Sequence, residues 1–183
     1  MTSIETKSQK IINEATTRIK MPKKLYIGDP LYFEEYENDA SELKRLTYVN
    51  TFRRPDWIGS LKIVEGEETY EFNGKESTFK TIDLHAYFAP NEELLKLYEE
   101  DKKYKYQKVS TLQIGVDTAK YIIGFDDQEQ TIRTGADGFW GAVYEYKNKG
   151  KLEGLTFDLG LGDLYSFDEA KKKLEYLFDT KFN

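Results

Sequence analysis

The stretch TYEFNGKESTFKTIDLHAYF, residues 69–88, decides the fold class. Asn73-Gly74 separates two runs of β-forming residues, and this dipeptide is the strongest short-range hairpin signal because both residues accept positive φ. After the turn, apolar and polar residues alternate, so one face of the strand should be buried and the other wet. The apolar series is Ile82, Leu84, Ala86 and Phe88. This stretch therefore predicts antiparallel sheet.

The chain beyond this hairpin carries further strand signals and one clear helix. Tyr121–Phe125 is apolar on both faces, which is typical of a central strand. Residues 139–146 and 155–159 form a second hairpin around a polar turn at 147–150. Ser166 and Glu169 make a capping box at the start of a C-terminal apolar stripe. We predict an α+β fold: a twisted antiparallel β-sheet built from hairpins, with a C-terminal amphipathic helix and short peripheral helices.

Residues 1–22 have the features of a basic helical arm. Apolar residues recur there at helical spacing until Pro22 ends the pattern, namely Ile11, Ile12, Ala15 and Ile19. We therefore predict a helical arm at residues 1–22, packed loosely, and a single α+β domain at residues 23–183. The alternative interpretation is a terminus that is simply solvated.

Charge is divided unevenly along the chain. Residues 1–24 carry six lysines and arginines against two glutamates, a net charge of +4. Because the whole chain has a net charge of −6, residues 25–183 carry a net charge of −10. The acidic body is expected to bind a basic protein surface, whereas the basic arm is expected to contact phosphate groups. The arm residues predicted to contact RNA or a partner are Arg18, Lys20, Lys23 and Lys24.

Composition excludes several classes of function. The 183-residue chain has no run of about 18 apolar residues, no secretion signal and no cysteine, so we expect a cytoplasmic protein with no membrane role. His85 is the only histidine, which excludes zinc sites that need several imidazoles. His85 remains a candidate general base, or a surface histidine. Nucleotide-binding and serine-hydrolase motifs do not occur.

Four aspartates lie beside glycines at the ends of apolar runs: Asp29, Asp117, Asp137 and Asp163. Carboxylate oxygens at strand ends are typical ligands for Mg²⁺ or another divalent cation, which is the cofactor we expect if these turns converge. In that case Asp29, Asp117 and Asp137, with His85, are the catalytic candidates. The alternative is that each aspartate only shapes a turn, a role that asparagine would preserve.

Residues 102–108 interleave cations with aromatic rings, a composition that contacts phosphate and stacks on bases. The candidates for this role are Lys102, Lys103, Tyr104, Lys105 and Tyr106. The same composition also suits an exposed strand edge, where lysines discourage pairing with another edge.

Gly28-Asp29-Pro30-Leu31-Tyr32 resembles the Gly-Asp-Pro-Cys-Tyr signature of small proteins from phages and mobile elements, with Leu31 in place of the cysteine. Val116–Ala119 and Ala136–Phe139 are similar to two later segments of such proteins. The chain also resembles anti-CRISPR proteins in its small size, its acidic body, its many tyrosines and its absence of cysteine.

This resemblance implies an inhibitor of a type II CRISPR effector nuclease, with the effector and its guide RNA as partners. The inhibitor would act by protein–protein contact and by promoting guide-RNA truncation through an aspartate-bound metal. Two other hypotheses stay open: a non-enzymatic phage binding protein with another partner, and a stand-alone metal-dependent phosphodiesterase.

Overall fold

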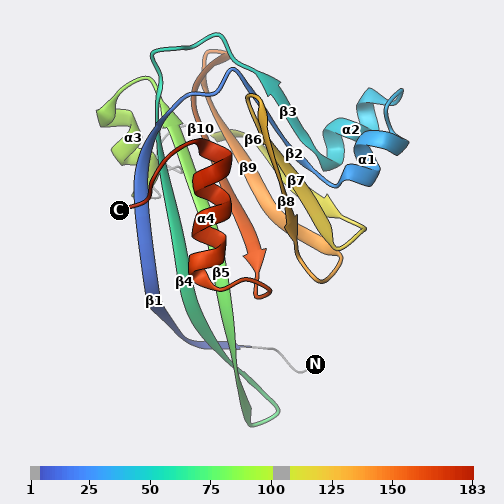
Figure 1. Ribbon diagram of the computed structural model, residues 1–183, viewed down its shortest axis with the longest axis vertical. Helices are drawn as coiled ribbons and strands as arrows, with labels where there is room; N and C mark the ends of the chain where they lie inside the picture. Colours follow the sequence, from blue (N-terminus) through green and yellow to red (C-terminus); the bar gives the residue numbers. More distant parts are fainter. Residues whose placement is uncertain (1–4, 101–107) are drawn as a thin grey trace.

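The computed structural model describes residues 5–100 and 108–183, with side chains from residue 8 in the first range and residue 112 in the second. Two antiparallel sheets, of six and four strands, form with a C-terminal helix and short peripheral helices (Figure 1). The predicted α+β fold class is confirmed. No helix in the described ranges is long and apolar enough to cross a membrane.

The larger sheet has the strand order β1-β4-β5-β10-β9-β6. Its sequence-adjacent hairpins are β4–β5 and β9–β10, so both hairpins predicted from the turn residues are present. Asn73 and Gly74 adopt φ values of 51° and 76°, as the tight β4–β5 turn requires. The strands are β1 (Glu5–Lys20), β4 (Ile58–Phe72), β5 (Lys75–Ala89), β6 (Lys108–Val116), β9 (Gly138–Asn148) and β10 (Lys151–Gly162).

The smaller sheet has the order β3-β2-β7-β8, with β2 and β7 in the centre. Its strands are β2 (Lys24–Gly28), β3 (Tyr48–Thr51), β7 (Lys120–Phe125) and β8 (Gln128–Arg133). The predicted central strand at Tyr121–Phe125 is β7, which is hydrogen-bonded on both sides. The helices are α1 (Pro30–Glu35), α2 (Ala40–Leu46), α3 (Glu92–Glu99) and α4 (Phe167–Phe178).

The main core lies between the inner face of the larger sheet and a second layer made of the smaller sheet and α4 (Figure 1). The alternating residues of β5 point inward as predicted, with Leu84, Ala86 and Phe88 fully buried. The Ser166 side chain accepts a hydrogen bond from the Glu169 amide at 3.1 Å, and the apolar stripe of α4 joins the same core. Helix α3 packs in a separate cluster that includes Tyr98 and Tyr146.

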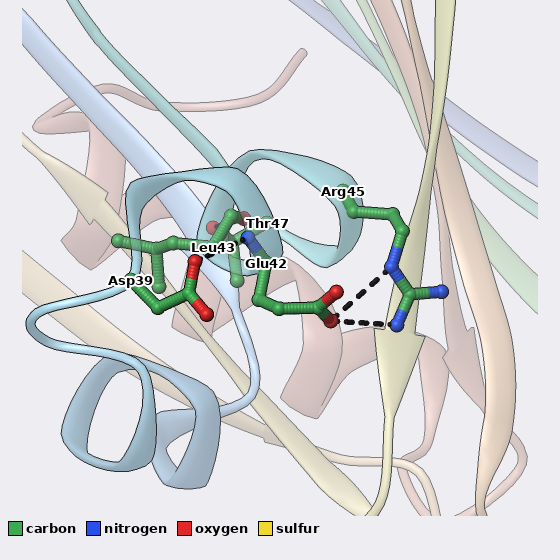
Figure 2. Close-up of polar contacts among 5 residues, drawn as sticks. All are labelled: Asp39, Glu42, Leu43, Arg45 and Thr47. Carbon is green, nitrogen blue, oxygen red and sulfur yellow. Dashed lines mark hydrogen bonds and ion pairs between the residues drawn. The ribbon is translucent and has the colours of Figure 1, made fainter.

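Helix α2 is held by short-range polar contacts (Figure 2). Asp39 caps its first turn by accepting a hydrogen bond from the Glu42 amide at 3.3 Å, and Glu42 pairs with Arg45 at 2.8 Å. At the other end, the Thr47 amide donates to the Leu43 carbonyl at 2.9 Å. These contacts all lie within nine residues, so they fix the two ends of the helix locally.

The predicted N-terminal helix is wrong, because Glu5–Lys20 forms the 16-residue strand β1. This strand pairs with β4 from Glu5↔Glu71 to Lys20↔Ile58, through two register shifts. Ala15 is buried and Ile19 packs against the core, whereas Ile11 and Ile12 are exposed. The helical spacing of these four residues was therefore misleading. β-branched side chains and a long pairing partner favour the extended chain, and β1 is an edge strand rather than a loosely packed arm.

Candidate functional site

Three of the four glycine-turn aspartates come together. Asp29 follows β2, Asp117 follows β6 and Asp137 precedes β9. The Asp117 amide donates to Asp29 Oδ2 at 2.7 Å, and the Ala119 amide donates to Asp137 Oδ1 at 3.0 Å. The chain connections that carry these residues are thus joined by carboxylate-to-amide bonds.

Asp29 is the centre of this junction and is fully buried. Its Oδ1 accepts hydrogen bonds from the Leu31 amide and the Thr118 hydroxyl, each at 2.8 Å. Its Oδ2 accepts from the amides of Asp117 and Thr118, at 2.7 and 2.8 Å. Because four donors surround it, this carboxylate satisfies the start of α1 and the β6–β7 turn together.

The junction does not fit a divalent cation. Asp29 points both oxygens at protein donors, and no group of three or more His, Cys, Asp or Glu in the described ranges is placed to hold a metal ion. The three carboxylates are close enough to act on Tyr32, whose pKa is raised by burial and then by Asp117, Asp29 and Asp137, with Tyr36 also contributing. Their arrangement is that of a structural hub, which joins the chain connections after β2 and β6 and before β9.

Asp163 lies elsewhere, in a cleft at the corner where β10 ends beside the protruding β4–β5 hairpin (Figure 1). This corner cleft has a volume of about 390 Å³. It combines aromatic and aliphatic side chains with two carboxylates and small turn residues. Its lining is Phe79, Lys80, Thr81, Ile82, Asp83, Thr134, Gly135, Ala136, Trp140, Gly160, Gly162, Asp163 and Leu164.

Asp83 is the unusual group of the corner cleft. Within the described ranges its carboxyl accepts no hydrogen bond and forms no ion pair. Burial raises the pKa of Asp83, and the charges of Glu68 and Asp158 raise it further, whereas His85 lowers it. A carboxylate in this setting is stabilised by any cation that enters the cleft.

Trp140 lines the corner cleft together with Asp83. Its Nε1 donates to the Ala136 carbonyl at 3.0 Å, which fixes the orientation of the indole. A Cβ at Gly160 would lie 3.2 Å from Trp140 Cε3 and 3.7 Å from Asp83 Oδ1. Glycine at this position therefore lets an indole ring and a carboxylate border the same space. Such a pair is suited to an organic cation.

His85 lies on the outer face of the larger sheet, two residues from Asp83. Its Nδ1 contacts Asp158 Oδ1 at 2.6 Å, across the β5–β10 pair. The side chain is 32% exposed, so the imidazole is open to solvent while its orientation is set by the carboxylate. Asp158 is a partner that sequence reasoning missed, because it lies 73 residues away.

The predicted basic contacts separate into two groups. Arg18 pairs with Glu92 at 3.1 Å and with Glu99 at 3.9 Å, which ties β1 to α3. Lys20 and Lys23 instead line a cavity of about 510 Å³ together with Arg53 and Arg54, which sequence reasoning missed. The Phe52-Arg53-Arg54-Pro55 segment was the available signal.

Lys24 is exposed, and its ammonium lies 5.4 Å from the centre of the Tyr26 ring. The remaining predicted contacts lie outside the described residues: Lys102, Lys103, Tyr104, Lys105 and Tyr106.

Comparison with known proteins returns no relative. No protein-family model matches the chain, and neither a curated protein nor a solved structure matches it. The geometry of these sites and the sequence resemblance are therefore the observations that bear on function.

Proposed function

We propose that this protein is a binding protein that captures a basic surface of a partner protein with its corner cleft. The observation that carries the proposal is Asp83, a partly buried carboxyl with no donor or cation bonded to it among the described residues, which lines the same cleft as an oriented indole. An arginine or lysine side chain of the partner would supply the missing positive charge. Its aliphatic stem would pack on the apolar lining.

The hairpin next to the corner cleft also carries carboxylates and exposed aromatic side chains. Residues 64–80, here called the acidic hairpin, contain five glutamates and two lysines, a net −3. Lys80 is already paired with Glu65 at 3.0 Å. Phe72 and Phe79 are 46% and 55% exposed, so the acidic hairpin offers large apolar side chains among its carboxylates. Aromatic anchors within a charged surface are characteristic of protein-binding hot spots.

The partner we propose is a type II CRISPR effector nuclease with its guide RNA. The Gly28–Tyr32 motif and the overall composition support this choice through their resemblance to phage and anti-CRISPR proteins. Such effectors hold nucleic acid in a positively charged channel, which is the kind of surface that a carboxylate cleft complements. Inhibition would follow from occupation of that surface. It requires no cleavage of the guide RNA.

A cleavage assay with effector, guide RNA and target DNA tests this proposal. The wild-type protein should block DNA cleavage and leave the guide at full length on the same gel. Asp83→Asn, combined with Phe79→Ala, should weaken effector binding by at least about tenfold, because the variant removes both charge and contact area. Asp127→Asn, an exposed change in the β7–β8 turn, is the matched control.

Undiminished inhibition by the cleft variant would refute the role of the cleft. Shortened guide RNA would refute pure binding.

A second measurement separates the cleft from the identity of the partner. N-acetylarginine amide, titrated at millimolar concentration, should change the fluorescence of Trp140, while Trp57 is buried in the core and supplies a constant background. The citrulline analogue, which has the same shape without the charge, should have little effect. An arginine response without any effector binding would favour a binding protein with a different partner. No arginine response would contradict the cation-binding cleft itself.

A further inference from the structure

Cations gather at the opposite end of β10 from the corner cleft. A cavity of about 520 Å³ lies between the edge of β3, the β3–β4 loop and the β9–β10 turn. Four cationic side chains line it, against one carboxylate from Glu145. That carboxylate already accepts from the Tyr48 hydroxyl at 3.2 Å and lies 3.6 Å from the Lys147 ammonium. The four cations are Arg54, Lys147, Lys149 and Lys151.

Arg54 is held in place as a fixed element of this surface. One of its guanidinium nitrogens donates to the Leu152 carbonyl at 2.7 Å, and the group lies 4.9 Å from the centre of the Trp57 ring. Arg54 also lines the neighbouring cavity that contains Lys20, Lys23 and Arg53. The two cavities therefore share one anchored arginine, so a row of cations lines both. The second cavity also includes Asp126, whose Oδ1 already accepts from the Lys23 and Lys24 amides at 2.6 and 3.1 Å.

The other cations are presented to solvent. Lys149 and Gly150 occupy the two central positions of the β9–β10 turn, with φ values of 52° and 79°. This two-residue turn projects Lys149 beside the exposed Lys151. Neither lysine forms an ion pair with a residue that the structure describes.

We infer that this row, here called the basic end, binds consecutive phosphates of a nucleic-acid strand. A single phosphate would need two or three donors, whereas cations continue through both cavities. The aromatic residues nearby are buried: Phe52 and Trp57 are 7% and 6% exposed. Contact with the sugar–phosphate backbone, independent of sequence, is therefore favoured over base stacking.

The overall charge of −6 does not oppose this inference. The corner cleft begins at Gly160 of β10, nine residues along the strand from Lys151, about 30 Å away at a rise of about 3.3 Å per residue. Screening reduces interactions between exposed charges beyond about 8 Å at physiological ionic strength. The basic end is therefore governed by its own charges.

Fluorescence anisotropy with a labelled single-stranded oligouridylate of about 12 nucleotides tests the inference. We expect micromolar binding at about 50 mM salt and binding weakened by at least about tenfold at about 200 mM salt. The Lys149→Glu/Lys151→Glu variant should lose about tenfold or more in affinity and flatten the salt dependence by about one unit of slope or more. A DNA strand of the same length should bind similarly if the backbone is recognised.

The matched control is Lys75→Glu/Lys172→Glu, which makes the same charge change at exposed positions that line neither cavity of the basic end. A second variant, Lys20→Glu/Arg53→Glu, tests the adjoining cavity without altering the turn. Circular dichroism should show all three variants folded. Equal loss in the control, absence of binding at low salt, or binding to anionic vesicles but not to oligonucleotides would overturn the inference.

Discussion

Asp29 lies just after β2 and Asp83 lies within β5, and the surroundings of the two carboxyl groups are opposite. Asp29 is fully buried and accepts four hydrogen bonds from residues of the β2–α1 and β6–β7 connections. Asp83 is partly buried and accepts none from the described residues, while Glu68 and Asp158 add negative charge nearby. The fold itself supplies the donors around Asp29, whereas the partly exposed carboxyl of Asp83 is open to solvent and to an incoming cation.

This difference separates a structural role from a binding role. A buried charge is tolerated when hydrogen-bond donors surround it. Removing the charge leaves those buried donors without an acceptor. A charge without donors lowers stability, and a protein retains it where a ligand uses it. The motif that looked most functional in the sequence, Gly28-Asp29-Pro30, is thus a structural junction, whereas Asp83 carried no motif at all.

Asp29→Asn should have the largest effect on stability. The amide group would place a donor against the Asp117 and Thr118 amides, so two backbone N–H groups would lose their acceptor, at a cost of about 3 kcal/mol. This outcome is opposite to the preserved turn expected from sequence. Urea unfolding measures the change.

Asp39→Asn is the control for Asp29→Asn, because Asp39 caps α2 with one bond in an exposed position (Figure 2) and should cost less than about 1 kcal/mol. Equal effects of the two changes would contradict the assignment of Asp29 as a hub.

Thr118→Val should have an intermediate effect. The substitution keeps the side-chain shape but removes the hydroxyl that donates to Asp29 Oδ1 at 2.8 Å. Loss of one hydrogen bond to a carboxylate should cost about 1.5 to 2 kcal/mol. Thr131→Val, at an exposed position on β8, should be nearly neutral. If the two valine variants melt at the same temperature, the hydroxyl contributes nothing to the junction.

Asp83→Asn should have the smallest effect, and of opposite sign. The pKa of Asp83 is raised above its ordinary value of 3.8 by burial and by neighbouring carboxylates, so the folded state binds the proton more tightly than the unfolded state. The wild-type protein therefore loses stability as the pH rises from about 3.8, the ordinary pKa of an aspartate, through the higher pKa of Asp83 in the folded state. Asparagine removes this loss.

The Asp83→Asn variant should consequently equal the wild type at low pH and exceed it at pH 7, by less than about 1 kcal/mol. Melting temperatures across pH 3 to 8 would reveal the difference. A variant less stable than the wild type at pH 7 would mean that Asp83 has a stabilising partner.

Local patterns predicted much of the fold. Asn73-Gly74, the alternation along β5 and the Ser166 capping box act over a few residues, and all three are present. The N-terminal strand was missed because its helical spacing is equally local, whereas its pairing is not. Ala15 lies opposite Ile63 in β4, and it is buried in the main core that this long-range pairing brings together.

The candidate sites were predicted less well. The sequence placed aspartates beside glycines, and three of them do meet, but three of the four donors of Asp29 come from residues 88 and 89 positions away. The corner cleft joins Asp83, Trp140 and Gly160 from three different strands, so no single window of sequence contains it. The basic end likewise combines the Arg53-Arg54 pair with a turn that looked purely structural.

The sequence by itself determined the turns, the helix caps, the buried face of β5 and the α+β class, because these depend on backbone preferences and periodicity within about ten residues. Only the tertiary structure decided which charges are satisfied. Whether a carboxylate is a hub or a binding group depends on how many donors distant strands place around it, and hydrogen bonding and desolvation act over a few ångströms of space rather than along the chain.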